Sequence, residues 1–164
     1  MADRSNNKIR ITVVTPYKTF LEEKVESVTL PALDGDIGIM AGHTPLVLAL
    51  KPGIAMVRNG DEKRHFTVSE GYAEIGQHMI LVVCNSAEWP EDINLRRMCE
   101  SYKDSKESLM AANAIEDKRA RDIALKELEQ EAGRARARRK LIESYGTDQQ
   151  RNRLSELREE YDWE

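Results

Sequence analysis

The 164-residue chain has few cysteines and no excess of basic residues. Its two cysteines, Cys84 and Cys99, have no neighbours at the spacing of a metal-binding or redox motif. We expect two reduced thiols in a cytosolic protein, with a disulfide between them as the less favoured alternative. The formal net charge is -4, which argues against a nucleic-acid-binding protein because such proteins usually carry basic excess.

Long hydrophobic runs are also missing. No segment approaches the roughly 18 apolar residues that a membrane-spanning helix requires. The amino-terminal residues MADRSNNK are polar and lack the apolar stretch of a secretory signal. We therefore expect a soluble, cytoplasmic protein that reaches a membrane only through a protein partner.

Motifs that carry catalytic chemistry are absent as well. The glycines of Gly35-Asp36-Ile37-Gly38 precede no phosphate-binding GxxxxGK[ST] pattern, so a sheet turn is the favoured interpretation. His43, His65 and His78 are scattered, without the spacing of a metal site. No serine or cysteine lies in a nucleophile motif. The sequence predicts no catalytic site, no metal and no bound cofactor.

Residues 1–88 contain short apolar runs separated by turn residues. Such runs, rich in β-branched side chains, are typical of an antiparallel β-sandwich or barrel. Asn59-Gly60 is the sharpest turn signal, because both residues tolerate the positive φ of a type I′ hairpin. The runs are Ile9–Pro16, Val25–Ala32, Pro45–Leu50, Ile54–Val57, His65–Val68 and Met79–Cys84.

After Trp89-Pro90 the apolar residues follow helical spacing, and charged residues surround them. We predict an α-helical hairpin over residues 89–145, which makes the chain an α+β protein in two parts. Pro90 suits a first helical turn, and Asn113 followed by Glu116 resembles a cap that starts the second helix. One continuous helix stays open as an alternative, because alanines dominate the connection.

The C-terminal extension, residues 146–164, has a sparse apolar pattern. We expect Gly146 and Thr147 to end the second helix, and the extension to be weakly helical or disordered.

A basic run is the most marked charge feature of the second half, and it consists of Arg134, Arg136, Arg138, Arg139 and Lys140. These side chains spread over more than half of the helix circumference. A solvated helix face is one interpretation, and a surface for an acidic partner is the one we favour. No aromatic residues interleave the run, which speaks against nucleic acid.

The stretch Leu33–Gly53, LDGDIGIMAGHTPLVLALKPG, resembles the most characteristic segment of the bacterial epsilon subunit of F-type ATP synthase. The family pattern is G-x-x-G-I, then G-H-x-P-L, then K-P-G. The matching residues are Gly35, Gly38, Ile39, Gly42, His43, Pro45, Leu46, Lys51, Pro52 and Gly53. The first hairpin and the junction Ala87–Ile93 also resemble the family, and the resemblance extends over about residues 9 to 144.

The resemblance implies a non-catalytic rotor subunit in the central stalk, at the cytoplasmic face of the bacterial plasma membrane. It would bind the gamma subunit and the c-ring, and couple rotation of the ring to the catalytic head. The residues implied at the ring are Asp34, Gly35, Asp36 and Ile37, and His43 is implied near gamma. Gly42 and Pro45 are implied at the same c-ring and gamma interface.

In this family the helical hairpin can extend toward the catalytic alpha and beta subunits and restrain ATP hydrolysis. We hypothesise that the basic run Arg134–Lys140 meets acidic segments of the beta subunits and carries this restraint. Some members bind ATP through an [IL]-D-x-x-R-A motif, which Ile93 and Arg97 match, as does Glu88 just upstream of it. Asn94 and Met98 replace the aspartate and the alanine of the motif, so we expect weak or no ATP binding.

Two other functions remain as alternatives to the stalk subunit. A generic adaptor would join a β-domain and a coiled-coil arm to another partner, and a nucleic-acid-binding module would use the arginine run. Co-purification with a gamma subunit would distinguish the stalk subunit from the adaptor. Salt-dependent retention of the chain on DNA would be needed to support the nucleic-acid-binding module.

Overall fold

The structure, a computed structural model, describes residues 7–163. The chain divides into two compact units between Trp89 and Pro90. The first unit is built of strands and the second of helices, and each is described by itself.

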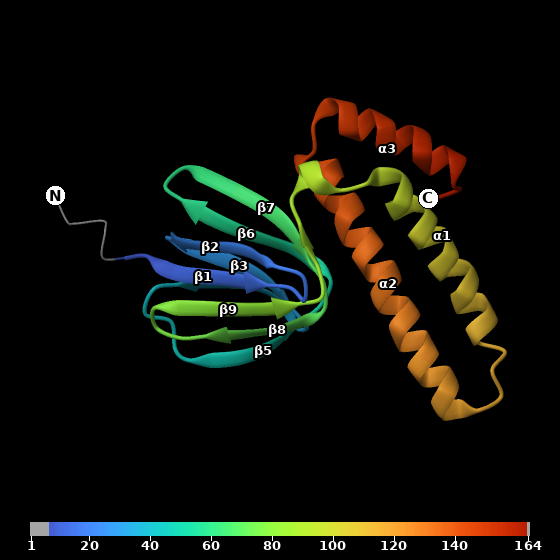
Figure 1. Ribbon diagram of the computed structural model, residues 1–164, viewed down its shortest axis with the longest axis horizontal. Coiled ribbons are helices and arrows are strands. Elements are labelled where there is room, and N and C mark those ends of the chain that lie inside the picture. The colour runs from blue at the N-terminus through green and yellow to red at the C-terminus, as the bar shows by residue number, and fades with distance from the viewer. Residues whose placement is uncertain (1–6, 164) are drawn as a thin grey trace. The chain divides into compact units, whose positions relative to one another are not determined.

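Ten strands form the first unit (Figure 1). The bounds are β1 Ile9–Val14, β2 Thr19–Val25, β3 Ser27–Ala32, β4 Gly35–Met40, β5 Leu46–Leu50, β6 Gly53–Asn59, β7 Glu62–Val68, β8 Gly71–Ile75, β9 Met79–Cys84 and β10 Ala87–Glu88. Their pairing order is β10-β7-β6-β3-β5-β8-β9-β1-β2, with β4 paired to β3. The predicted β-sandwich is therefore confirmed, with one exception to its antiparallel pairing: β1 lies parallel to β9.

Alternation of side chains builds the core of the sandwich. In β1, Ile9, Ile11 and Val13 are fully buried, while Arg10 between them is exposed, as expected for a strand with one face on a core. Among residues 7–163, Phe66 is the largest fully buried side chain. Trp89 packs beside it, with ring centroids 5.1 Å apart, so Trp89 belongs with the sandwich and not with the helical part.

The β6–β7 turn differs from the predicted type I′ turn. Asn59 pairs with Glu62 across the hairpin, so the two turn residues are Gly60 and Asp61. Of these two, only Gly60 has positive φ, at 58°. Glycine at the first central position is typical of a type II′ turn. The predicted turn was therefore wrong by one residue.

The second unit begins with a 3₁₀ turn, η2 Pro90–Asp92, followed by α1 Leu95–Ala112, α2 Lys118–Tyr145 and α3 Asp148–Glu160. The side chains of Asn94 and Asp117 cap α1 and α2 by accepting backbone N–H groups. The predicted cap at Asn113 was wrong, because Asn113 follows the last residue of α1. A loop separates the two helices, so they do not form one continuous helix.

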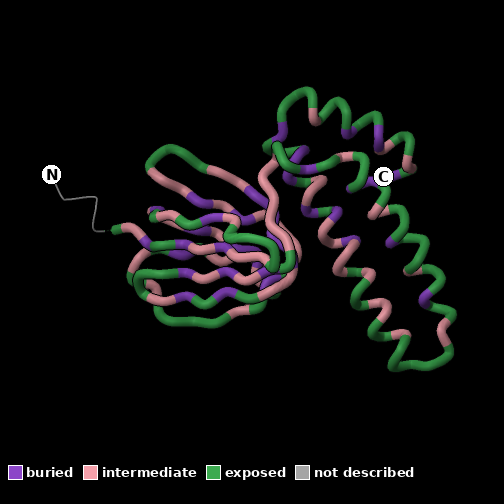
Figure 2. Tube along the Cα trace, viewed as in Figure 1, coloured by how far each residue is buried: buried purple, intermediate pink, exposed green. Residues whose placement is uncertain are grey.

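Small residues line the seam between α1 and α2. The buried residues along it include Ser105, Ala112, Ala132 and Ala135. Figure 2 shows that the end of the hairpin near the connecting loop is mostly exposed. The predicted hairpin is confirmed, and its loop end buries little apolar surface.

The C-terminal extension forms helix α3. Thr147 and Gln150 form a capping box at its start, in which each side chain satisfies a backbone N–H of the other residue. Its buried side chains are Leu154 and Leu157. Across residues 7–163, no helix is both long and apolar enough to cross a membrane.

Candidate functional site

The β3–β4 turn holds the first predicted interface residues. Leu33 and Asp34 connect the strands, and Gly35 follows with φ 131°, a value that favours glycine. Asp34 and Asp36 are exposed. Ile37 is partly buried against the sandwich core. The turn therefore presents two carboxylates to solvent and is anchored by one apolar side chain.

The remaining predicted interface residues, Gly42, His43 and Pro45, lie beyond the other end of β4. Gly42, with φ 83°, donates its backbone N–H to the carbonyl of Gln77 at 2.7 Å. His43 Nδ1 lies 2.7 Å from the carbonyl oxygen of Thr44. Six strand residues span roughly 17 Å, so the structure places the predicted residues at two ends of the sandwich rather than in one site.

Sequence reasoning missed an apolar patch on the outer face of β5 and β8. We call Val47, Ala49 and Tyr72 the outer patch, since Ala49 pairs with Tyr72 and all three are exposed. The exposed Glu74, which pairs with Val47, borders the patch. Val47 keeps 67% of its surface accessible. The signal was present in the run LVLAL, which is apolar at every position. In an antiparallel strand, such a run indicates that the second face is also apolar.

The basic run lies in the second half of α2 and is only partly accessible. Arg136 and Lys140 are exposed, whereas Arg134, Arg138 and Arg139 are partly buried. Arg139 forms an ion pair with Glu143 at 2.8 Å. In this conformation the run offers two exposed cations, not five.

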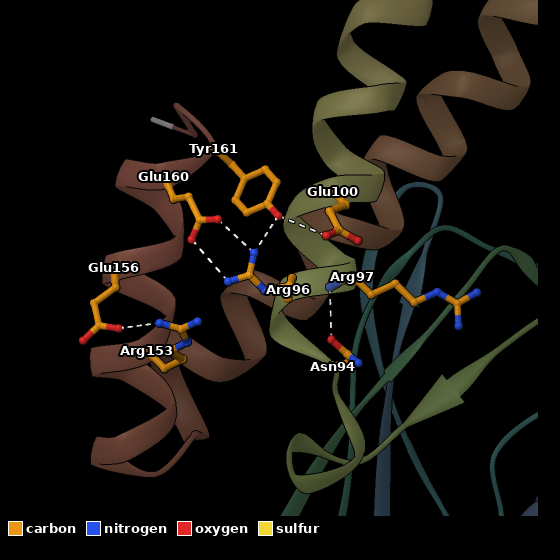
Figure 3. A network of polar contacts seen from close by, with 8 residues as sticks. All are labelled: Asn94, Arg96, Arg97, Glu100, Arg153, Glu156, Glu160 and Tyr161. Atoms are coloured by element: carbon orange, nitrogen blue, oxygen red, sulfur yellow. Dashed lines mark hydrogen bonds and ion pairs between the residues drawn. The ribbon is translucent and has the colours of Figure 1, made fainter.

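The partial ATP motif is divided between the two units. Glu88 belongs to β10 of the sandwich, and Ile93 and Arg97 belong to the helical unit. Asn94, in place of the aspartate, accepts the Arg97 backbone N–H at 3.0 Å (Figure 3). Met98, in place of the alanine, is buried. The two replacements therefore serve the cap and the packing of α1.

Reactive groups are few in the part of the chain that the structure describes. Within residues 7–163, no three His, Cys, Asp or Glu side chains are grouped as a metal site would require. Burial raises the pKa of both cysteine thiols, Cys84 and Cys99, above the ordinary value. A raised pKa keeps a thiol protonated and a poor nucleophile.

Comparison with known proteins identifies the family. The model of the ATP synthase, Delta/Epsilon chain, beta-sandwich domain matches residues 8–90. The chain belongs to this family. An ATP synthase epsilon chain of Alkaliphilus metalliredigens is 35% identical over 103 residues, covering 63% of this chain and 77% of the relative. One from Cyanothece sp. is 30% identical over 135 residues, covering 82% of this chain and 98% of the relative.

A solved structure of the same class supports the fold. A chain in the Euglena gracilis mitochondrial ATP synthase assembly superposes with a TM-score of 0.65 at 20% identity, over 82% of this chain and 81% of that chain. The family model and the epsilon-chain relatives confirm the expected resemblance to the epsilon subunit of F-type ATP synthase.

Proposed function

We propose that the chain is a non-catalytic central-stalk subunit of an F-type ATP synthase that joins the gamma subunit to the c-ring and rotates with them. The observation that carries this proposal is the family match over residues 8–90, the same residues that form the sandwich. Torque passes through contacts, and a densely packed core such as that around Phe66 deforms little under load.

Two surfaces of the sandwich suit the two partners. The exposed carboxylates Asp34 and Asp36 would face polar loops of the c-ring. The outer patch would bind gamma, because neighbouring exposed apolar side chains on one sheet face gain from burial against a protein partner. The loop with Gly42, His43 and Pro45 would extend the gamma contact.

Co-purification with the gamma subunit tests this assignment. Val47→Asp places a charge in the outer patch and should reduce the gamma retained by tagged chain at least about tenfold, as for loss of a buried interface contact. Tyr17→Asp, at a sandwich residue that is 90% exposed, is the matched control and should retain gamma. Equal retention by both variants would exclude the outer patch, and no retention by the unmodified chain would favour the adaptor.

The helical unit is the proposed regulatory arm, which restrains ATP hydrolysis through the catalytic alpha and beta subunits. Two observations support this role: Arg136 and Lys140 are exposed, and the small-residue seam of the hairpin makes rearrangement inexpensive in free energy. Acidic segments of the beta subunits are the proposed targets of the basic run.

Hydrolysis by the assembled complex tests the arm. Deletion of residues 90–164 should raise ATPase activity, and the Arg136→Glu, Lys140→Glu double variant should raise it partly. Lys126→Glu, at an exposed α2 cation outside the basic run, is the control and should change nothing. Unchanged hydrolysis after the deletion would contradict a restraining role.

ATP is not a proposed ligand of the arm, because Asn94 and Met98 have structural roles in α1. Isothermal titration of the full chain should show no binding of ATP in the micromolar range, and micromolar affinity would overturn this proposal. Through its partners, the subunit would be peripheral at the cytoplasmic face of the plasma membrane.

A further inference from the structure

Trp163, close to the C-terminus, contacts both arms of the helical hairpin. Its ring stacks on Tyr102 of α1, with centroids 4.0 Å apart and planes 12° apart. The guanidinium of Arg139 in α2 lies 5.3 Å from the Trp163 ring centroid. Trp163 is only 3% exposed. A single side chain of the C-terminal extension thus joins α1 and α2.

A turn at the end of α3 determines the position of the Trp163 side chain. The N–H of Trp163 bonds the carbonyl of Arg158 at 2.9 Å, and the N–H of Asp162 bonds that of Glu159. This pattern is the Schellman motif, which ends a helix with a residue in the left-handed region. Asp162 is that residue, with φ 51°. Glycine is usual there, so the chain adopts a less favourable backbone conformation that brings Trp163 back to the hairpin.

Polar contacts reinforce the same junction (Figure 3). Arg96 of α1 pairs with Glu160 of α3 at 2.8 Å and donates to the Tyr161 hydroxyl at 3.0 Å. The Tyr161 hydroxyl lies 3.0 Å from Glu100 of α1. Arg158 reaches Glu143 of α2 at 3.4 Å. Contacts to both α1 and α2 therefore come from the last six residues that the structure describes.

The hairpin depends on this junction because the seam between α1 and α2 buries little apolar surface of its own toward the loop. The large buried side chains of the helical unit lie near the start of α1, near the end of α2, and in or after α3: Ile93, Met98, Leu141, Ile142, Leu154, Leu157 and Trp163. Three of these seven belong to α3 or follow it. Toward the loop, the buried residues of α1 are Ser105 and Ala112, which offer little apolar area.

We propose that residues 148–163 form a C-terminal clasp that holds α1 against α2 and thereby sets how often the hairpin opens. The clasp itself rests on these contacts. Its regulatory consequence, that releasing the clasp frees the arm to restrain hydrolysis, rests on the proposed function.

Hydrogen exchange of the full-length chain, read by mass spectrometry, tests the clasp. Trp163→Ala should speed exchange of the α1 amides about a hundredfold, as expected for loss of a buried tryptophan in a local opening reaction. Amides of residues 9–88 should be unaffected. Arg96→Ala removes the ion pair with Glu160 and the contacts with Tyr161, and it should act in the same direction with a smaller change.

Two variants serve as controls. Arg153→Ala lies on the same helix and loses only its ion pair with Glu156, so exchange in α1 should not change. Asp162→Gly suits the left-handed conformation and should slow α1 exchange or leave it unchanged. Unchanged α1 exchange in both Trp163→Ala and Arg96→Ala would overturn the clasp.

The assembled complex separates this inference from the proposed function. With Trp163→Ala, ATP hydrolysis should be restrained more strongly than with the unmodified chain. If α1 exchange increases and hydrolysis stays the same, the clasp stands and the proposed regulatory role of the arm fails.

Discussion

Gly71 gives the sharpest test of the packing in the sandwich. It begins β8 and pairs with Cys84 of β9. A Cβ added at Gly71 would lie 2.0 Å from the backbone carbonyl oxygen of Val83, whereas ordinary contact begins at 3.4 Å. The obstacle is the backbone of a paired strand, which cannot move aside as the end of a flexible side chain could. Gly71→Ala must therefore separate β8 from β9 locally.

The cost follows from that separation. Overpacking of a core with small shifts costs about 1–3 kcal/mol, and a shift of more than about 1 Å across paired backbone places Gly71→Ala at the upper end, about 3 kcal/mol. Gly38 is the matched control. It is an exposed strand glycine with nothing within 4 Å of an added Cβ. Gly38→Ala should be neutral, or stabilising by about 0.5 kcal/mol.

Urea unfolding can report on the sandwich alone, because Trp89 belongs to the first unit and Trp163 to the second. In a Trp163→Phe background, fluorescence follows Trp89. Gly71→Ala should lower the midpoint by about 1–3 M at the slope usual for small domains, while Gly38→Ala should leave it within about 0.5 M. Equal midpoints for the two variants would refute the argument from backbone approach.

Three further predictions concern other parts of the chain. Because burial raises the pKa of the Cys84 and Cys99 thiols, both should react slowly with a thiol reagent at pH 8 and rapidly in urea; rapid reaction of the folded chain would contradict this. Asp117→Ala removes the acceptor of the Ala120 N–H and should destabilise the helical unit by about 1 kcal/mol, measured as a lower urea midpoint by Trp163 fluorescence in a Trp89→Phe background. Burial lowers the pKa of His65 from 6.5, so the unfolded chain binds more protons between pH 6.5 and the lower folded value. The free energy of unfolding should fall as pH drops through that window and level off below it. For His65→Gln it should fall less over the same window, and the same pH dependence for both proteins would contradict the assignment.

The sequence predicted the type of most elements but not every pairing. The alternation of Ile9, Ile11 and Val13 identifies a strand with one buried face, and the same period holds for parallel and antiparallel neighbours. The parallel pairing of β1 with β9 is therefore set by tertiary packing and cannot be inferred from the periodicity of the sequence. The cap of α2 was misplaced for a local reason: Asn113 and Asp117 are both capping residues, and alanines around the first continue the helix.

The surfaces were harder to predict than the fold. The motif around Leu33–Gly53 identified the family. It did not reveal that strand β4 separates Asp34 from His43, which lie beyond its opposite ends. For α3, the pair Thr147 and Gln150 matches the S/T-x-x-E/Q capping pattern. That local signal was available, whereas the burial of Trp163 depends on contacts with α1 and α2 that no local pattern contains.

The two units differ in a way that suits a rigid anchor with a movable arm. The members of the sandwich core cluster, and the residues packed against it, all lie between Ile9 and Trp89. None of them belongs to the helical unit, so opening of the hairpin removes no contact within this core. The hairpin relies on alanines in its seam and on three large side chains supplied by the extension, Leu154, Leu157 and Trp163. Its stability can therefore be adjusted through α3 without weakening the sandwich, because local opening costs only the contacts of the part that opens.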